Sequence, residues 1–240
     1  MFYTYSDAGQ FVLLDGDRIA CLLARLISRL LLQQNSELRF GVVQTAYANG
    51  ASTDFLSSLP NADIECTSTG VKYLHHSASL YDIGLYFEPN GHGTILLSSK
   101  ARSQLPSLNT ELFRFCQIAN EYVGDAISDM LLVLVALSLE KLSVREWNDL
   151  YKERASSLLK VAVPDRYLIQ TKDADRQIEK PVELQHKIDA LVASYGASRA
   201  FARPSGTEDY VRIYAEAGGQ QDAQSLAHGI AQIIGDYFKQ

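Results

Sequence analysis

Apolar residues recur at helical spacing over residues 19–34, and the run LRFGVVQT that follows at 38–45 is typical of a buried strand. Helical and strand patterns continue to alternate as far as residue 142. The other elements predicted in this part are helices at 52–59, 70–80, 107–122 and 125–142 and strands at 62–67, 82–88 and 93–98. Strands that alternate with helices predict an α/β domain whose sheet is largely buried.

The pattern changes after residue 144. A polar helical stretch at 145–157 is interpreted as a connector. The elements predicted beyond it are a strand at 165–172, a polar turn at 173–181, an amphipathic helix at 182–195, a half-buried strand at 210–217 and a helix at 222–238. This region therefore predicts a second, smaller α+β domain from about residue 145 to residue 240.

Composition narrows the classes of partner. The chain has 240 residues, of which 47% are hydrophobic, and its formal charge is 22 − 28 = −6. Because non-specific nucleic-acid binding depends on clustered Lys and Arg, this acidic chain is not expected to bind nucleic acid. Its most apolar run, MLLVLVALSL at 130–139, has ten residues where a membrane span needs about 20, so it predicts a buried helix.

The N-terminal residues lack the basic segment and apolar core of a signal peptide. The cysteines, Cys21, Cys66 and Cys116, show neither a CxxC pair nor metal-ligand spacing. Free thiols of this kind are typical of a reducing compartment. We therefore predict a cytoplasmic protein with no membrane segment.

The stretch ARPSGTEDYVR at 202–212 gathers groups that suit an anion. Gly206 lets the backbone turn tightly or approach a ligand, Ser205 and Thr207 add hydroxyl donors, and Arg203 and Arg212 add planar guanidinium groups that match phosphate. The alternation of the strand at 210–217 leaves Arg212 on its solvated face. The residues alone allow two interpretations: a phosphate-binding loop, or an ordinary turn whose arginines pair with its own acidic residues.

Two further stretches contain polar groups between predicted elements. FEPNGHGT at 87–94 holds a carboxylate and an amide that could bind sugar hydroxyls, although Asn-Gly is also the signature of a plain hairpin turn. TGVKYLHHSA at 69–78 places Lys72 near a predicted helix start, where it could reach a phosphate or hydroxyl or stay solvated. Adjacent histidines on a helix point in different directions, so His75 and His76 are not expected to share a metal.

The order of these stretches resembles the α-D-phosphohexomutase superfamily. FARPSGTEDYVRIYAEA resembles its C-terminal phosphate-binding loop, and FEPNGHGT, TGVKYLHHSA and GVVQTAYANGAST resemble the phosphoacetylglucosamine mutase branch. The resemblance covers nearly the whole chain. It implies a mixed-sheet α/β domain (domain 3) at 14–144, a smaller α+β C-terminal domain (domain 4) at 145–240, and a remnant of domain 2 at 1–13.

The resemblance also implies an activity. Family members interconvert the 6-phosphate and 1-phosphate of a hexose, here N-acetylglucosamine, in the synthesis of UDP-N-acetylglucosamine. Domain 1 supplies a phosphoserine, domain 2 binds Mg²⁺, domain 3 contacts the sugar and domain 4 grips the phosphate that stays in place.

The resemblance assigns roles to residues of domains 3 and 4. Substrate phosphate binding is assigned to Arg203, Ser205, Gly206, Thr207 and Arg212. Sugar binding is assigned to Glu88, Asn90, Gly91 and His92. Lys72 and His76 match positions near the reacting end, while the role of His75 stays open.

Two family motifs are missing from these 240 residues. The phosphoserine motif T-A-S-H-N-P is absent, and so is the DGDxDR metal loop. From its residues, LDGDR at 14–18 is either a divalent-metal loop or a helix start capped by Asp15 or Asp17, and the resemblance aligns it with a helix start just downstream of the metal loop. We therefore expect no catalytic residue, no Mg²⁺ ligand and no mutase activity in this chain alone.

Other interpretations stay open at this point. The chain could be a non-catalytic phosphosugar-binding module or pseudoenzyme, or it could derive from another phosphohexomutase, although EPNGHGT differs from the GExSG type of sugar loop. Residues 1–13, without the rest of domain 2, are expected to form an exposed strand edge. Such an edge favours fraying or self-association.

Overall fold

The computed structural model describes residues 1–34 and 36–239, and it divides into two compact units, Met1–Lys152 and Glu153–Gln240. The helices of the first unit are α1 (Gly16–Gln33), α2 (Gly50–Ser57), α3 (Val71–Ala78), α4 (Ser99–Leu108), α5 (Thr110–Cys116), α6 (Ala126–Glu140) and α7 (Val144–Asn148). Its strands are β1 (Phe2–Tyr5), β2 (Phe11–Leu14), β3 (Phe40–Thr45), β4 (Ala62–Thr67), β5 (Ile83–Phe87) and β6 (Gly93–Leu97).

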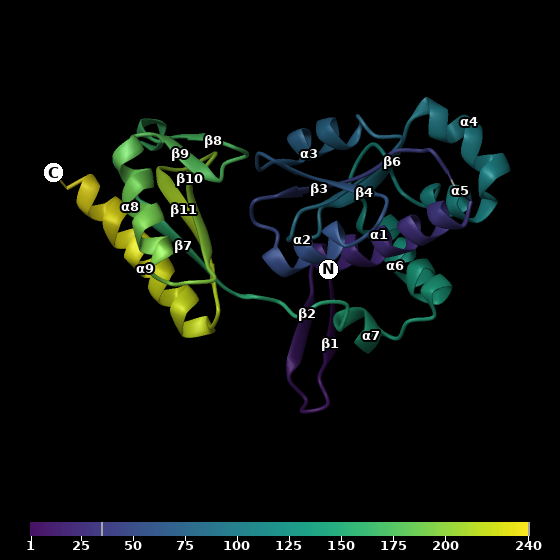
Figure 1. Cartoon of the computed structure of the whole chain (residues 1–240), viewed down its shortest axis with the longest axis horizontal. Coiled ribbons are helices and arrows are strands. Elements are labelled where there is room, and N and C mark those ends of the chain that lie inside the picture. The colour runs from purple at the N-terminus through teal and green to yellow at the C-terminus, as the bar shows by residue number, and fades with distance from the viewer. Residues whose placement is uncertain (35, 240) are drawn as a thin grey trace. The chain divides into compact units, whose positions relative to one another are not determined.

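A mixed sheet with the strand order β4-β3-β5-β6 forms the centre of the first unit (Figure 1). Strand β3 runs parallel to β4 and β5, and β6 runs antiparallel to β5. Because successive side chains point to opposite faces, Val42 joins the large core with α1 whereas Val43 packs with Leu74 of α3. The predicted α/β domain with a buried sheet is confirmed.

The helix predicted over 107–122 is wrong. Helix α4 ends at Leu108 and α5 covers only Thr110–Cys116. Asn109 between them has a φ of −151°, and its side-chain oxygen accepts a hydrogen bond from the N–H of Leu112 at 2.9 Å. An asparagine that caps a new helix in this way interrupts an apolar pattern that reads as continuous.

Helix α6 is buried on one face only, although its sequence predicts a buried helix. Leu132, Val133 and Ala136 are fully buried, whereas the side chains of Ile127 and Leu134 are 68% and 52% exposed. The helix packs through one stripe, so its other apolar residues face outward. Among the described residues, no helix has the length and apolar character required to cross a membrane.

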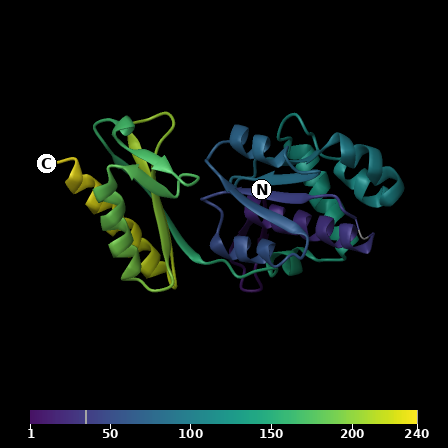
Figure 2. The ribbon, with the colours of Figure 1, turned by 45° about the horizontal axis from the view of Figure 1, so that its top comes forward.

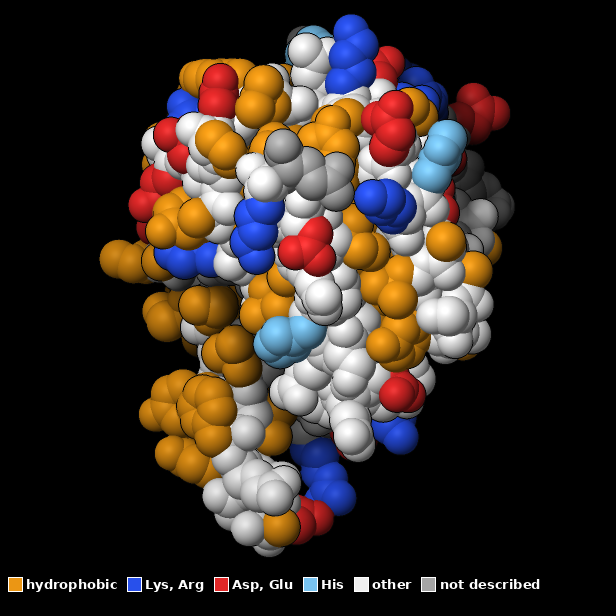
Figure 3. Space-filling view, turned by 90° about the vertical axis from the view of Figure 1, so that its left-hand side faces the viewer, with side chains coloured by type: hydrophobic (Ala, Val, Ile, Leu, Met, Phe, Trp, Pro, Cys, Tyr) orange, Lys and Arg blue, Asp and Glu red, His pale blue; other side chains and the backbone are white. Residues whose placement is uncertain are grey.

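The N-terminal segment pairs with itself. Strands β1 and β2 form an antiparallel hairpin in which Tyr3 lies opposite Leu13 and Tyr5 opposite Phe11. These four exposed side chains share one face, and Figure 3 shows hydrophobic side chains gathered on this projecting hairpin, low in the view. On the other face, the ring of Phe2 packs edge-on against Trp147, with 5.5 Å between ring centroids.

The second unit is an α+β domain, as predicted. Its elements are β7 (Ala155–Ala162), a short 3₁₀ helix (Arg166–Leu168), β8 (Gln170–Lys172), β9 (Gln177–Lys180), α8 (Val182–Ala193), β10 (Arg199–Pro204), β11 (Tyr210–Ala217) and α9 (Gln220–Tyr237). The antiparallel sheet β10-β11-β7 carries α8 and α9 on one face (Figure 2). Val211 and Ile213 of β11 are buried against Ile230 of α9.

Two elements predicted between residues 145 and 172 are wrong. The polar stretch at 145–157 is not one connecting helix, because α7 ends at Asn148 and strand β7 begins at Ala155. The strand predicted at 165–172 shortens to Gln170–Lys172 after the 3₁₀ helix. Trp147 is fully buried in the core of the first unit, which extends to Lys152.

Candidate functional site

The predicted sugar loop lies at the carboxyl edge of the parallel strands. Because β3, β4 and β5 run in the same direction, the segments that follow them emerge at one edge of the sheet. The loop Glu88–His92 joins β5 to β6 at this edge, and α3 begins there after β4. Ligands of open α/β sheets bind outside the carboxyl ends of the strands, which makes this edge the candidate site of the first unit.

Hydrogen bonds inside the loop fix its shape. The N–H of Glu88 donates to the carbonyl of His92 at 2.8 Å, and the N–H of His92 donates to Oδ1 of Asn90 at 2.9 Å. The amide of Asn90 reaches the carboxylate of Glu88 at 3.4 Å, and Gly91 has a φ of +90°, which favours glycine. Glu88 is 9% exposed while Asn90 and His92 are exposed. A buried carboxylate below an exposed amide can bind hydroxyl groups.

The start of α1 packs against this loop and supports it. The N–H of Gly16 donates to the carbonyl of Pro89 at 3.0 Å. A Cβ atom at Gly16 would lie 1.8 Å from the carbonyl oxygen of Glu88, so only glycine allows this close approach. Gly16 is a supporting residue that the sequence did not reveal, because the contact joins segments far apart in the chain.

The aspartates of LDGDR hold the fold together. Asp15 caps α1, since its Oδ1 accepts a hydrogen bond from the N–H of Arg18 at 3.1 Å, and this confirms the predicted helix start. The buried carboxylate of Asp17 accepts the N–H of Asn49 at 2.7 Å. Arg18 stacks on the ring of Tyr151 at 4.1 Å from the ring centroid. The motif therefore anchors two loops to the start of α1.

Lys72 and His76 lie on α3, which starts at the same edge of the sheet. Both side chains are exposed, and Nζ of Lys72 sits 4.7 Å from the centroid of the Tyr73 ring. In the part of the chain that the structure describes, no hydrogen bond or ion pair connects either residue to the loop Glu88–His92. The fold brings these residues to the same edge without bringing them into contact.

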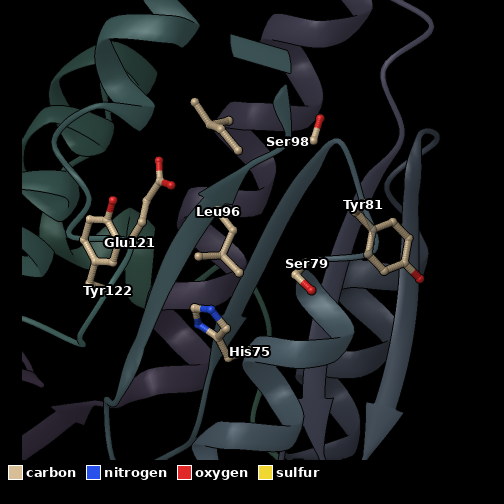
Figure 4. Close-up of a pocket in the computed structure, with 8 residues that line it drawn as sticks. His75, Ser79, Tyr81, Leu96, Ser98, Glu121 and Tyr122 are labelled. Atoms are coloured by element: carbon tan, nitrogen blue, oxygen red, sulfur yellow. The ribbon is translucent and has the colours of Figure 1, made fainter. Parts of the chain in front are cut away.

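His75 faces a different cavity. Its Nδ1 lies 3.3 Å from the hydroxyl of Tyr86. A cavity of about 300 Å³ opens beside it toward the opposite edge of the sheet, and Figure 4 shows Glu121 and Tyr122 on its other side. Its lining residues are His75, Ser79, Tyr81, Leu96, Leu97, Ser98, Glu121 and Tyr122. The candidate sugar residues do not line this cavity.

A second cavity, of about 350 Å³, adjoins the loop Glu88–His92 and includes Gly91 in its lining. Asp129 of α6 also lines it. Burial, together with the negative charge of Asp125, raises the pKa of the Asp129 carboxyl to about 7. A carboxyl that titrates near neutrality beside the candidate loop was not singled out from the sequence, because Asp129 lies within an otherwise apolar run.

In the second unit, the register of the sheet brings together the two arginines that are predicted to bind phosphate. Arg203 of β10 lies directly opposite Arg212 of β11, on the face away from α8 and α9. Like charges placed opposite each other destabilise a sheet unless a counter-ion compensates them. Among the described residues, no ion pair joins Arg212 to Glu208 or Asp209, and Nη1 of Arg203 donates to the carbonyl of Pro204 at 3.3 Å.

The loop that follows Arg203 offers further donors. Ser205 is 3% exposed, and its Oγ has no hydrogen-bond partner among the described residues. Gly206 and Thr207 are exposed at the tip of the loop. A cavity of about 310 Å³ borders Ser205 and Gly206 and is lined as well by Arg166, a basic residue that the sequence analysis did not single out. The arrangement is a cationic, hydroxyl-bearing loop able to bind an anion.

Comparison with known proteins gives the family. Residues 15–142 match the model described as phosphoacetylglucosamine mutase AMG1, domain III, and residues 158–233 match the phosphoglucomutase/phosphomannomutase C-terminal domain. The chain belongs to the phosphoacetylglucosamine mutase family. It is 46% identical to the phosphoacetylglucosamine mutase of Sus scrofa over 98% of this chain and 45% of the relative. The Saccharomyces cerevisiae enzyme is also 46% identical, over 98% of this chain and 44% of the relative.

A solved structure shows the same fold. The N-acetylphosphoglucosamine mutase of Aspergillus fumigatus, in complex with GlcNAc-6P and magnesium, matches with a TM-score of 0.93 and 42% identity. The match covers 98% of this chain and 46% of that chain. This member of the phosphoacetylglucosamine mutase family therefore spans less than half the length of the relatives it matches.

The residues described here do not fit a magnesium site. Among them, no group of three or more His, Cys, Asp and Glu side chains could hold a metal ion. Asp15 and Asp17, the carboxylates that most resemble metal ligands in the sequence, accept backbone hydrogen bonds.

Proposed function

We propose that this chain supplies the sugar-binding and phosphate-binding domains of a phosphoacetylglucosamine mutase, which interconverts N-acetylglucosamine 6-phosphate and 1-phosphate for UDP-N-acetylglucosamine synthesis. Within it, residues 14–144 would be domain 3, residues 145–240 domain 4, and residues 1–13 part of domain 2. Membership of the family supports the reaction. The free thiols of Cys21 and Cys116 support a cytoplasmic enzyme, because they suit a reducing compartment.

The observation that carries this proposal is the pairing of Arg203 with Arg212 across β10 and β11. Their guanidinium groups would hold the substrate's non-reacting phosphate with planar pairs of N–H donors. The buried Oγ of Ser205 would donate to the same phosphate, and Gly206 and Thr207 would add a backbone N–H and a hydroxyl. Phosphate thereby neutralises two like charges that the sheet places opposite each other.

The sugar would bind at the carboxyl edge of the first unit. The buried carboxylate of Glu88 would accept hydrogen bonds from ring hydroxyls, with Asn90 and His92 at the rim. Gly91 keeps the loop in the left-handed backbone conformation that orients these groups. Lys72 and His76 would approach the reacting end from the start of α3.

The residues of this chain would bind and orient the substrate, but the transfer of a phosphoryl group requires further groups. Phosphoryl transfer needs an acceptor and donor for the phosphoryl group and strong charge neutralisation, which Mg²⁺ supplies when bound in such enzymes. The 240 residues contain no T-A-S-H-N-P or DGDxDR motif, and the described carboxylates do not fit a metal. Because uniform binding does not accelerate a reaction, we propose that the isolated chain binds phosphosugar without turning it over.

Calorimetric titration with N-acetylglucosamine 6-phosphate tests the phosphate site. Arg203→Ala should weaken binding at least about tenfold, because charge-assisted hydrogen bonds contribute about 1.5–3 kcal/mol. Arg176→Ala is the matched control, since Arg176 pairs with Asp173 in the exposed turn between β8 and β9. Equal affinity of wild type and Arg203→Ala would remove the phosphate-loop assignment.

A coupled assay tests the absence of turnover. The purified chain, supplied with Mg²⁺ and N-acetylglucosamine 6-phosphate, should form no 1-phosphate above a blank. Turnover that persists in repeated preparations and disappears with Arg203→Ala would overturn the proposal. Binding without turnover is also what a non-catalytic phosphosugar-binding module would show. Addition of a purified N-terminal half from a relative separates the two, because only the mutase domains should then regain activity.

A further inference from the structure

A third cation lies in line with the two arginines of the phosphate loop. Strand β7 pairs with β11 so that Lys160 lies directly opposite Arg212, which itself lies opposite Arg203. Side chains opposite each other in neighbouring antiparallel strands share a face and have Cβ atoms about 4.5–5.5 Å apart. The three basic residues therefore form a row across β10, β11 and β7, on the face away from α8 and α9.

The ammonium group of Lys160 is directed toward the loop end of this row. Its Nζ lies 4.6 Å from the centroid of the Tyr210 ring. Tyr210 is the first residue of β11 after the loop, and its carbonyl accepts the N–H of Ser205 at 2.8 Å. A cation–π contact of this kind holds a flexible lysine in place without neutralising it. The lysine thus leans over the residue that closes the phosphate loop.

The charges around the loop indicate what a third cation would contribute. The loop between the two arginines also contains two carboxylates, Glu208 and Asp209. The charges of Arg203 and Arg212 cancel those of the two carboxylates, so Arg166, beside the cavity at Ser205, leaves one positive charge. A phosphate monoester carries nearly two negative charges above its second pKa of about 6. Lys160 adds a second net positive charge, which matches the dianion. Its ammonium group, at the end of a flexible side chain, can adjust to the position of the phosphate.

We propose that Lys160 is a third cationic contact for the substrate phosphate and favours its dianionic form. This inference rests on the proposed function, because it assumes that the loop binds a phosphosugar. It adds a residue from β7, outside the segment 202–212, to the phosphate site.

Titrations of the full chain with N-acetylglucosamine 6-phosphate and with inorganic phosphate, at pH 7.5 and pH 5, test the proposal. Lys160→Met should weaken both ligands at least about threefold at pH 7.5 and low salt, and less at pH 5, where the phosphate is largely monoanionic. Lys160→Arg should keep most of the affinity, because it keeps the charge. Lys187→Met, at an exposed position of α8, is the matched control and should bind like wild type.

The outcomes separate this inference from the proposed function. If Arg203→Ala weakens binding and Lys160→Met does not, the third contact is wrong and the phosphate loop stands. If neither variant weakens binding, the phosphate loop itself is wrong. A loss that is equal at both pH values, or that Lys160→Arg does not rescue, would mean that Lys160 acts only through packing on Tyr210, and it would overturn the inference as well.

Discussion

The carbonyl oxygen of Glu88 lies 1.8 Å from the position that a Cβ atom at Gly16 would take. The first turn of α1 and the loop Glu88–His92 therefore touch backbone to backbone, and the hydrogen bond from the N–H of Gly16 to the carbonyl of Pro89 fixes their alignment. Helix α1 is the most deeply buried helix of the first unit's core, so it provides a rigid base for the loop. The loop's position depends on the absence of one side chain.

Gly16→Ala should destabilise the first unit by about 1–3 kcal/mol, because the added methyl group overlaps backbone atoms that cannot move independently. Urea unfolding followed by fluorescence measures this directly, since Trp147 is the single tryptophan of the sequence and is buried in this unit. Gly124→Ala is the matched control. Its Cβ would meet the nearest atom, the carbonyl oxygen of Gly93, at 3.4 Å, so a change within about 0.5 kcal/mol is expected. Equal stabilities for the two variants would contradict the contact.

The carboxyl of Asp129 should make the stability of the first unit depend on pH. Its pKa is raised from 3.8 to about 7, first by burial and then by Asp125, and the amino group of Met1 partly offsets these effects. The folded state thus holds this proton more tightly than the unfolded state. Stability is therefore lost as the pH rises from about 4 to about 7 and stays low above that range.

Asp129→Asn removes this dependence. The variant should match wild type near pH 4 and exceed it by about 1–2 kcal/mol at pH 8, a figure reduced from the full pKa shift to allow for solvent screening. Urea midpoints from the Trp147 signal across this pH range provide the measurement. Asp63→Asn, whose side chain is 64% exposed on β4, should change the midpoint little at any pH. Parallel pH profiles for wild type and Asp129→Asn would show that the carboxyl is not buried in this way.

The periodicity of hydrophobic residues predicted those helices and strands that bury either one face or both faces. Strands β4 and β11 have the predicted bounds, and α1, α8 and α9 lie within a few residues of theirs. Strand β7 escaped prediction because Leu158 is exposed beside the half-buried Leu159, which blurs its alternation. The break between α4 and α5 is set by the capping side chain of Asn109. A hydrophobic pattern does not reveal a helix break that depends on a single polar residue.

The candidate site, like the fold, could be predicted only in part from the sequence. Loop composition drew attention to the groups on the loop after Arg203 and around Glu88 but allowed an ordinary turn at both places, and the family resemblance assigned their roles. What composition did not reveal is sheet register, which places Arg203 opposite Arg212 and Arg212 opposite Lys160. Register depends on pairing between distant segments, and so does the contact of Gly16 with Glu88. Single-residue chemistry can be read from sequence, whereas close approach of backbones requires the fold.

The exposed face of the N-terminal hairpin should drive self-association. Tyr5 and Phe11 are 63% and 62% exposed, and Phe11 stacks on Tyr3 with 5.7 Å between ring centroids. A contiguous aromatic face of this kind on a two-stranded hairpin is an association surface. Replacing both residues, in Tyr5→Thr/Phe11→Thr, keeps the strand preference and removes the rings. Sedimentation velocity at increasing concentration should show the wild type associating and the double variant remaining monomeric.

The control for this experiment is Tyr122→Thr, which removes one isolated ring that is 95% exposed outside the hairpin. It should associate like wild type, because a single exposed aromatic residue provides little area for a partner. Wild type that stays monomeric at all concentrations would dismiss the hairpin as an association surface. Equal association of the double variant and wild type would assign association to another surface.

Glu140 should be the most important ion-pairing residue for the packing of α6 on α1. Its side chain is 2% exposed, and its two oxygens accept hydrogen bonds from Nε of Arg25 and Arg29 at 2.7 and 2.6 Å. Glu140→Ala should cost about 1–3 kcal/mol by the Trp147 signal, less than for a fully buried pair because both arginines reach solvent. Asp7→Ala breaks an exposed pair with Arg145 and should cost less than about 0.5 kcal/mol. Equal small losses would mean that burial of the carboxylate does not strengthen these contacts, and that apolar packing alone holds α6 in place.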